Sequence, residues 1–171
     1  ATTSFYFIEV NTGIQVEHPV TEMITGVDLV AEMIRIAGGE RLSIEQDDVV
    51  IHGHAIECRI NAENPARNFL PGPGTIKSLK VPHAPDVRFD SMLFEGYTVP
   101  PFYDSLLGKL IVHGADRAAC LTRLQSVLNE LVIEGVPTTI ALHAALAADA
   151  SVAAGNIDTR FLEGWLPSQF A

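Results

Sequence analysis

The sequence predicts an α+β fold: a strand, loop and helix come first, and an antiparallel sheet with flanking helices follows. Short β-prone runs separated by Pro and Gly clusters fill residues 49–113, which is typical of an antiparallel sheet. Apolar residues at helical spacing lie on both sides of that region. With 47% hydrophobic and 19% charged residues, the 171-residue chain is rich enough in apolar side chains to bury a core.

The chain opens on a predicted strand. The apolar run at residues 5–8 is typical of a strand buried on both faces, and a polar turn at 11–13 follows it. Because such a strand needs neighbours on both sides and only four residues precede it, we expect either a piece of a larger protein or a partner that covers the open edge. A helix is predicted to start near Pro19, a second spans 28–37, and residues 40–48 are the expected linker.

The middle of the chain predicts four strands, at 54–60, 74–81, 87–89 and 105–113. Asp116 is the expected N-cap of a helix that carries a leucine stripe on its core side, at Leu121, Leu124, Leu128 and Leu131.

The C-terminal part of the chain predicts two more helices. Thr138 or Thr139 caps the first, which is rich in Ala and runs to about Asp149. The second is short, from Thr159 to Trp165, and we expect Phe161 and Trp165 to anchor it against the core.

The formal charge of −10, from 11 Lys and Arg against 21 Asp and Glu, argues against nucleic-acid binding, because a phosphate backbone is bound by clustered basic residues. No apolar run approaches the roughly 18 residues that span a bilayer, and no leader opens the chain. We therefore expect a cytoplasmic protein without a membrane partner. Cys58 and Cys120 are expected to be free thiols, because two cysteines are far below the density of a disulfide-rich secreted scaffold. Neither has the spacing of a zinc site.

The densest polar cluster follows the first predicted strand. It consists of Glu9, Asn11, Gln15, Glu17 and His18. On an extended backbone Glu9 and Asn11 share one side, and their oxygens suit a hard cation such as Mg²⁺. The alternative is a solvated strand end with a turn-forming Asn.

Two other candidates also have plain interpretations. His52 and His54 flank Gly53 as a potential metal pair, or they share a solvent-exposed face. Arg59 by itself is typical of a surface arginine or of one paired with Glu57.

As a whole string, residues 5–22 resemble the closing segment of the ATP-grasp domain of biotin carboxylase. The family form ends in Glu-x-Asn-Thr-Arg-x-Gln-Val-Glu-His-Pro-Val-Thr-Glu, and this chain departs from it at one fixed position. The resemblance continues into the family's C-terminal domain over residues 53–63, 71–74, 96–109 and 157–162. It implies two parts: residues 1–48 as the end of the ATP-grasp domain, and 49–171 as the biotin carboxylase C-terminal domain.

The resemblance also implies roles for the polar cluster. Glu9 and Asn11 would hold Mg²⁺ (or Mn²⁺) against the phosphates of ATP. Glu17 would be the general base on bicarbonate, which attacks the γ-phosphate to give carboxyphosphate, the source of CO₂.

A second group of roles concerns biotin. Arg59 would lie near the ureido oxygen of biotin and stabilise its enolate, since a developing anion needs a fixed cation. Gln15, the amide of Val16 and Asp104 would help to place bicarbonate and this arginine.

The one departure is Gly13, where the family has Arg. A glycine supplies no guanidinium fork for an oxyanion. Loss of such a contact costs on the order of 2–4 kcal/mol in the transition state, or roughly 10²- to 10³-fold in rate. The family's other Mg²⁺ carboxylate, its glycine-rich loop and its nucleotide-binding lysines lie upstream, so we expect the chain alone to be inactive.

The partners implied by the resemblance are a biotin carboxyl carrier protein or domain, a carboxyltransferase component and the N-terminal part of the carboxylase, within an acyl-CoA carboxylase. A homodimer through Arg88 and Phe89 is a further possibility, with a plain surface strand as the alternative. The alternative function is a non-catalytic interaction or scaffold module derived from the enzyme, which Gly13 favours.

Overall fold

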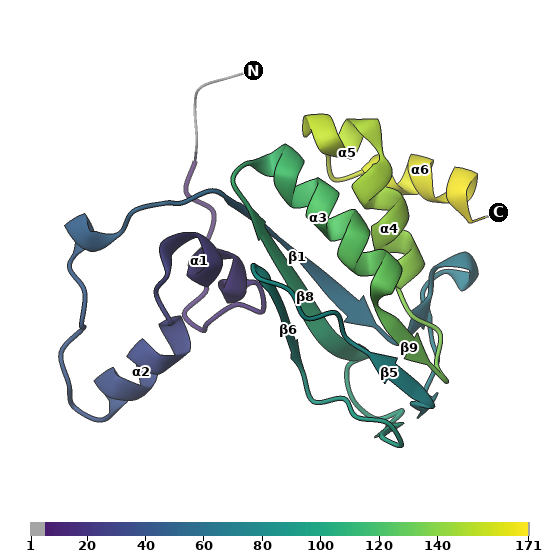
Figure 1. Ribbon diagram of the computed structural model, residues 1–171, viewed down its shortest axis with the longest axis horizontal. Helices are drawn as coiled ribbons and strands as arrows, with labels where there is room; N and C mark the ends of the chain where they lie inside the picture. The colour runs from purple at the N-terminus through teal and green to yellow at the C-terminus, as the bar shows by residue number, and fades with distance from the viewer. Residues whose placement is uncertain (1–5, 171) are drawn as a thin grey trace.

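The computed structural model describes residues 6–170, which form a small antiparallel sheet between two groups of helices (Figure 1). The helices are α1 (His18–Thr25), α2 (Leu29–Ala37), α3 (Arg117–Glu130), α4 (Ile140–Ala148), α5 (Ala150–Ala154) and α6 (Phe161–Gln169), with short 3-10 turns η1 (Gln46–Asp48) and η2 (Pro65–Arg67). The strands are β1 (His54–Asn61), β2 (Glu63–Asn64), β3 (Leu70–Pro71), β4 (Gly74–Thr75), β5 (Ser78–Lys80), β6 (Val87–Ser91), β7 (Thr98–Val99), β8 (Leu106–Gly114) and β9 (Val132–Glu134). The predicted α+β class is confirmed.

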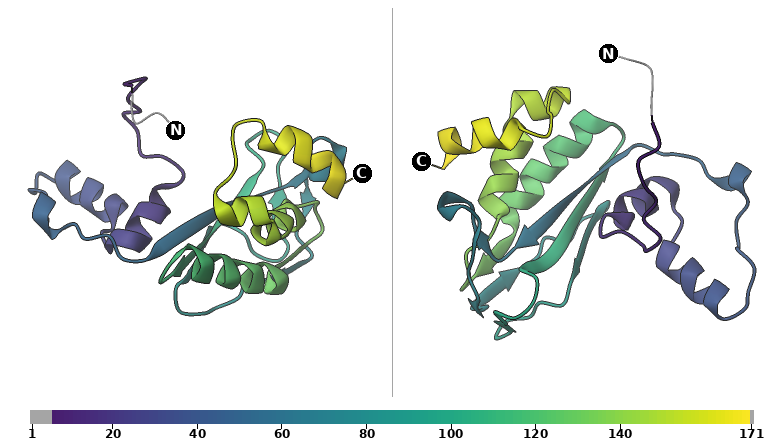
Figure 2. Two further views of the ribbon diagram at one scale, coloured as in Figure 1. Left: turned by 90° about the horizontal axis from the view of Figure 1, so that it is seen from above. Right: turned by 180° about the vertical axis from the view of Figure 1, so that it is seen from behind.

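The main sheet has the order β1-β8-β6, and both pairs are antiparallel. Because side chains alternate across a strand, each strand has one apolar and one charged face. The apolar face packs against α3, and the core that forms there includes Cys58, Ile60, Leu110, Val112, Leu121, Leu124 and Leu128. Figure 2 shows α1 and α2 at one end of the molecule and α3 to α6 over the other.

The second face of the sheet is charged and lies under α1. Arg59 on β1 is directly opposite Lys109 on β8, and Lys109 is opposite Asp90 on β6. Ile111, one alternate position further along β8, is 0% exposed. Helix α1 contacts both β1 and β8, so this face is partly covered.

Helix α3 confirms the sequence prediction. The Asp116 side chain accepts a hydrogen bond from the Ala119 amide at 2.8 Å, the usual N-cap interaction. The predicted leucine stripe is buried, from Leu121 to Leu131.

The predicted strand at 74–81 is two strands in the structure. β4 pairs with β7, whereas β5 pairs with β9. The backbone of Gly135, at φ 109°, approaches Thr75 so closely that a Cβ would lie 2.0 Å from the Thr75 carbonyl oxygen. This contact requires glycine. Strand β9 and helix α5 were not predicted.

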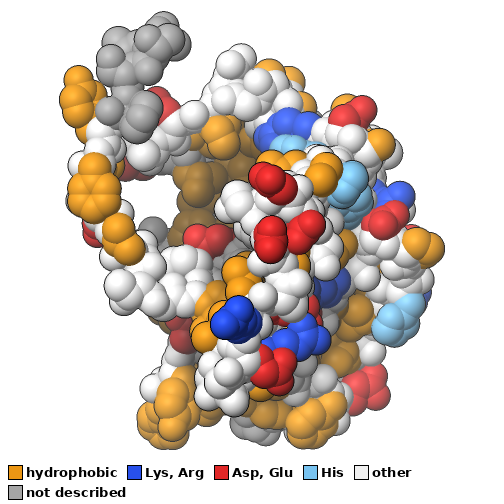
Figure 3. All heavy atoms as spheres, turned by 90° about the vertical axis from the view of Figure 1, so that its left-hand side faces the viewer, with side chains coloured by type: hydrophobic (Ala, Val, Ile, Leu, Met, Phe, Trp, Pro, Cys, Tyr) orange, Lys and Arg blue, Asp and Glu red, His pale blue; other side chains and the backbone are white. Residues whose placement is uncertain are grey.

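The prediction of a buried strand at the start of the chain was wrong for the residues that are described. Residue 5 lies outside the described range, and residues 6–8 form no strand and are 83%, 81% and 88% exposed. A strand needs hydrogen-bonding neighbours, and the described residues provide none for this segment. Figure 3 shows hydrophobic side chains along this arm.

Helix α2 forms as predicted, with Asp28 as its N-cap, but its apolar stripe is not in the core. Met33 and Ile36 are each 50% exposed, and the buried side chain of this helix is Glu32. Glu32 accepts hydrogen bonds from the amide and hydroxyl of Ser43, at 3.0 and 2.7 Å. These bonds and the Arg35 guanidinium hold the pKa of Glu32 below its usual range.

Helix α6 buries no residue, so the expected anchoring against the core was wrong. Phe161 and Trp165 stack on each other with ring centroids 5.9 Å apart, and the Trp165 indole donates to Asp149 at 2.8 Å. The helix is therefore held by the α4–α5 junction.

Two further observations concern the cysteines and the length of the helices. Cys58 and Cys120 are buried free thiols, and burial raises the pKa of Cys58 to about 12. Within residues 6–170, no helix is long and apolar enough to cross a bilayer.

Candidate active site

An ion pair joins the polar cluster to the sheet. Arg59 Nη2 donates to Glu17 Oε2 at 2.8 Å. Glu17 occupies the N-cap position of α1, with Pro19 in the first turn, and Arg59 projects from β1 toward that helix. Both side chains are about half exposed. The alternative pairing of Arg59 with Glu57 is not formed.

Lys109 fixes the turn that carries Glu17. Its Nζ donates to the Val16 carbonyl oxygen at 3.1 Å and lies 3.7 Å from Asp90 Oδ2. The lysine side chain is only 13% exposed, whereas Val16 is 38% exposed. On the other side of the turn, the Gln15 carbonyl oxygen accepts from the amide of His18 at 3.2 Å. The Val16 amide donates to no group among residues 6–170, which leaves it available to a ligand.

Glu22 anchors α1 to its surroundings. Its Oε1 accepts from the Leu29 amide at 3.0 Å, and its Oε2 accepts from Arg88 Nη1 at 2.6 Å. Arg88 also forms a bidentate pair with Asp90, at 2.7 Å for each contact. Burial by itself raises the pKa of Asp90, but the bonds to Arg88 and the charge of Lys109 hold it below its usual range. Arg88 is thus turned toward α1 in this chain.

Glu57 is a partly buried carboxyl group on the same face as Arg59. Its Oε2 is inaccessible to solvent and has no hydrogen-bond partner among the described residues. Burial raises the pKa of this carboxyl, and the charges of Lys109 and Arg59 only partly oppose the effect. The site therefore contains a carboxyl group that is costly to ionise.

Glu9 and Asn11 lie in the exposed arm, outside regular secondary structure. Neither side chain contacts another described residue through a hydrogen bond or ion pair. Their oxygens are the donor type that Mg²⁺ prefers, and the pair fits in kind as two of six ligands. Within the described ranges no three His, Cys, Asp or Glu side chains group to hold a metal ion. Of the two histidines considered as a potential metal pair, His54 has its Nε2 atom 3.3 Å from Arg117 Nη1.

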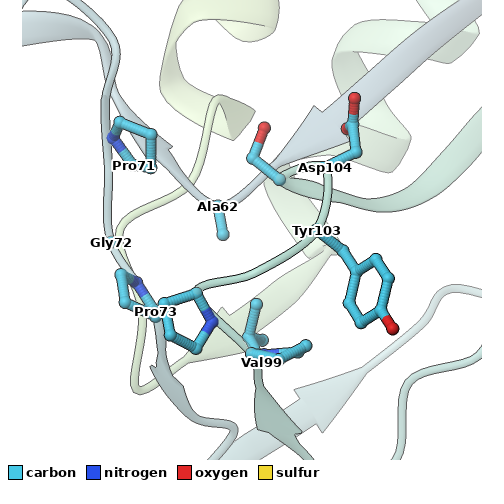
Figure 4. Close-up of a pocket in the computed structure, with 10 residues that line it drawn as sticks. Ala62, Pro71, Gly72, Pro73, Val99, Tyr103 and Asp104 are labelled. Carbon is cyan, nitrogen blue, oxygen red and sulfur yellow. The ribbon is translucent and has the colours of Figure 1, made fainter.

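Asp104 lies on the wall of a cavity of about 490 Å³. Figure 4 shows Pro71, Gly72 and Pro73 on one side of this cavity and Tyr103 and Asp104 on the other. The Asp104 carboxylate accepts from the Leu106 amide at 2.8 Å. Among the described residues it forms no hydrogen bond or ion pair with Arg59, so the structure does not join these two predicted site residues directly.

Gly13 is exposed and unhindered. A Cβ built on it meets no atom within 4 Å, and the backbone there does not require glycine. The position can therefore take the Cβ that the arginine of the family form requires.

Lys109, Thr139 and His143 were not recognised from the sequence as parts of the site. Lys109 is opposite Arg59, and Thr139 and His143 contact the Arg59 carbonyl oxygen. Strand register and helix placement bring them there, and no local sequence signal encodes either.

Two family models match parts of the chain. The model of the family described as "Biotin carboxylase C-terminal domain" matches residues 57–164. The model described as "Carbamoyl-phosphate synthase L chain, ATP binding domain" matches residues 1–45.

Among curated relatives, biotin carboxylase of Pseudomonas aeruginosa is 55% identical over 159 residues, which are 93% of this chain and 35% of the relative. Biotin carboxylase 1 of Bacillus subtilis is 50% identical, again over 93% of this chain and 35% of the relative. The chain thus spans about a third of the length of these proteins.

A solved structure has the same fold. It is the biotin carboxylase domain dimer of Hydrogenobacter thermophilus 2-oxoglutarate carboxylase, in complex with MgADP, ADP and bicarbonate. It superposes with a TM-score of 0.93 at 48% identity, over 97% of this chain and 36% of that one. The family model matches most of the chain, the curated relatives align with 93% of it, and the fold is shared. The chain therefore belongs to the biotin carboxylase C-terminal domain family.

Proposed function

We propose that this chain is the C-terminal part of the biotin carboxylase component of a biotin-dependent acyl-CoA carboxylase. Residues 1–48 would complete an ATP-grasp domain, and 49–171 would be the C-terminal domain. The observation that carries the proposal is the contact between Glu17 and Arg59, which are 42 residues apart in the chain and 2.8 Å apart in space.

Glu17 is the proposed general base. Because the Glu17–Arg59 pair is exposed, its separation by a substrate costs about 1 kcal/mol or less. Bicarbonate held between them would lose its proton to Glu17 while its oxygen attacks the γ-phosphorus of ATP. The bond to ADP breaks, and the product is carboxyphosphate, which yields CO₂ and phosphate.

Arg59 is the proposed cation for biotin. Its guanidinium would face the ureido oxygen, where negative charge develops as biotin captures CO₂. Gln15 and the free Val16 amide would hold bicarbonate. Asp104 would assist from the wall of the cavity, which Ala62, three residues after Arg59, also lines.

Glu9 and Asn11 would hold Mg²⁺ or Mn²⁺ through a carboxylate and an amide oxygen. The metal ion, when bound, supplies positive charge to the phosphates of ATP. The remaining ligands would come from ATP, water and other parts of the enzyme. The proposed partners are the biotin carrier, the carboxyltransferase, the N-terminal part of the carboxylase and, as a homodimer, a second copy. The proposed compartment is the cytoplasm.

The test uses a chimera in which this chain replaces the matching segment of the Pseudomonas aeruginosa relative. Bicarbonate-dependent release of ADP is measured with free biotin. We expect Glu17→Gln to abolish it, and Arg59→Ala to abolish its stimulation by biotin. Glu40→Gln and Arg41→Ala are matched controls, because both side chains are exposed and form no hydrogen bond or ion pair with a described residue. Unchanged turnover in Glu17→Gln would remove the assignment of Glu17 as the base.

A non-catalytic module derived from this enzyme is the second candidate function. Gly13 favours it, since the anion site then lacks the second guanidinium that the family form has at this position. A chimera with no bicarbonate-dependent turnover, whether position 13 is Gly or Arg, would support this alternative.

A further inference from the structure

Strand β1 lies at the edge of its sheet, so one side of its backbone has no strand partner. At Arg59 and Asn61 that side is bonded to α4. The Arg59 carbonyl oxygen accepts from His143 Nε2 at 2.8 Å and from the Thr139 hydroxyl at 3.2 Å. The Asn61 amide donates to the Thr139 hydroxyl at 3.0 Å, and the Thr139 amide donates to the Asn61 carbonyl oxygen at 3.2 Å.

These four bonds are confined to one part of the edge. Ala55 and Glu57 are the preceding alternate positions of β1, and their backbone groups accept no such bond from α4 in the described part of the chain. The register of β1 against β8 shifts between Ile60 and Asn61, and such an irregularity bends a strand and redirects its side chains. The bonds therefore hold β1 where it carries Arg59 and where it is irregular.

The Thr139 hydroxyl forms hydrogen bonds with β1 rather than with its own helix. Thr139 is the N-cap of α4, but its side chain makes no capping hydrogen bond. The residue is 4% exposed, and its hydroxyl donates to the Arg59 carbonyl oxygen and accepts from the Asn61 amide. A threonine that only started the helix would cap it.

We propose that His143 and Thr139 are positioning residues for Arg59: by bonding its carbonyl oxygen, they set the place of its guanidinium opposite Glu17. The inference rests on the proposed role of Arg59. His143 suits this task because burial lowers its pKa, an effect that its bond to Arg59 only partly opposes. The ring therefore stays neutral and donates from Nε2.

The experiment measures biotin-stimulated, bicarbonate-dependent release of ADP in the chimera. His143→Leu removes the donor, and His143→Gln keeps an N–H in its place. Since a displacement of about 1 Å can cost up to 10²-fold in rate, we expect His143→Leu to lower kcat about 10- to 100-fold with KM for ATP unchanged. His143→Gln should recover most of that loss.

A double-mutant cycle with Arg59→Lys separates positioning from general damage. If His143 acts through Arg59, His143→Leu should have less than about a 3-fold further effect in the Arg59→Lys background. A full effect in that background, or equal rates for His143→Leu and His143→Gln, would overturn the inference. Unchanged activity of Arg59→Lys alone would instead refute the proposed role of Arg59. Should His143→Leu not fold, Thr139→Val and its control Thr139→Ser replace it, and equal rates for these two would refute the inference.

Discussion

Lys109 Nζ lies 3.1 Å from the carbonyl oxygen of Val16 and so ties the middle strand of the sheet to the turn that carries Glu17. The lysine is also the direct cross-strand neighbour of Arg59. One rung of the sheet thereby supports both members of the Glu17–Arg59 pair.

Replacement of Lys109 by Met should release this turn. The apolar stem remains packed, but the Val16 carbonyl oxygen and Asp90 lose their shared cation. In the chimera we expect KM for bicarbonate to rise about 10-fold or more, since a hydrogen bond to a charged group contributes about 1.5–3 kcal/mol. Lys109→Arg is the control that keeps the charge. An unchanged KM for bicarbonate in Lys109→Met would show that the turn keeps its conformation without the lysine.

Gly13→Arg should increase activity. A Cβ at this position meets no atom within 4 Å, and a guanidinium here would give bicarbonate the additional fork of the family form. We expect bicarbonate-dependent release of ADP to rise roughly 10²-fold. Gly13→Leu tests whether bulk alone has this effect. Equal rates for Gly13 and the arginine variant would show that this position is not the defect.

Glu22→Gln should destabilise the packing of α1 on the sheet. Glu22 is 7% exposed and bonds both Leu29 and Arg88, and the amide would place an N–H₂ group against one of these donors. We expect a loss of about 1–3 kcal/mol in the free energy of unfolding, measured by urea denaturation. Glu40→Gln, on the surface, should show no change. Equal stability of the two variants would contradict a structural role for Glu22.

Glu57→Gln should stabilise the protein at neutral pH. Burial raises the pKa of Glu57 in the folded state. The contribution of this carboxyl to stability is therefore full when the pH is below its pKa in the unfolded chain, and it is lost as the pH rises through its pKa in the folded protein. The free energy of unfolding of the variant should therefore be higher by on the order of 1 kcal/mol at pH 7. This gain should vanish as pH falls toward the ordinary value of 4.5.

Thermal unfolding between pH 4 and pH 8 checks this prediction, and Glu130→Gln is the exposed control. A gain that is the same at every pH would show that ionisation of Glu57 is not its source.

Much of the fold could be predicted from local patterns. The Asp116 cap and the leucine stripe of α3 are encoded within one turn or two, and the structure confirms them. The failures have a common cause, since they depend on what lies next to an element. The arm at residues 6–8 has the composition of a strand but no neighbour among the described residues, and Thr139 looks like a cap but bonds to β1.

The candidate site follows the same division. Alternation along β1 places Glu57 and Arg59 on one face, but it does not say that Glu17 covers them. The resemblance of whole strings to a family assigns both residues to one site, and the structure places their side chains 2.8 Å apart. Lys109 could not be placed, because its position opposite Arg59 requires the register of β1 against β8.

The two-faced character of the sheet has a consequence for evolution and engineering. If β1 slid along β8 by one residue, Arg59 would turn into the hydrocarbon interior and Ile60 would turn out to the charged side. A slide of two residues would keep the faces but would move Arg59 about 7 Å along the strand, away from its present place beside Glu17. The register that buries the apolar face is thus the same one that places Arg59 opposite Glu17, so a shift in register would disturb both.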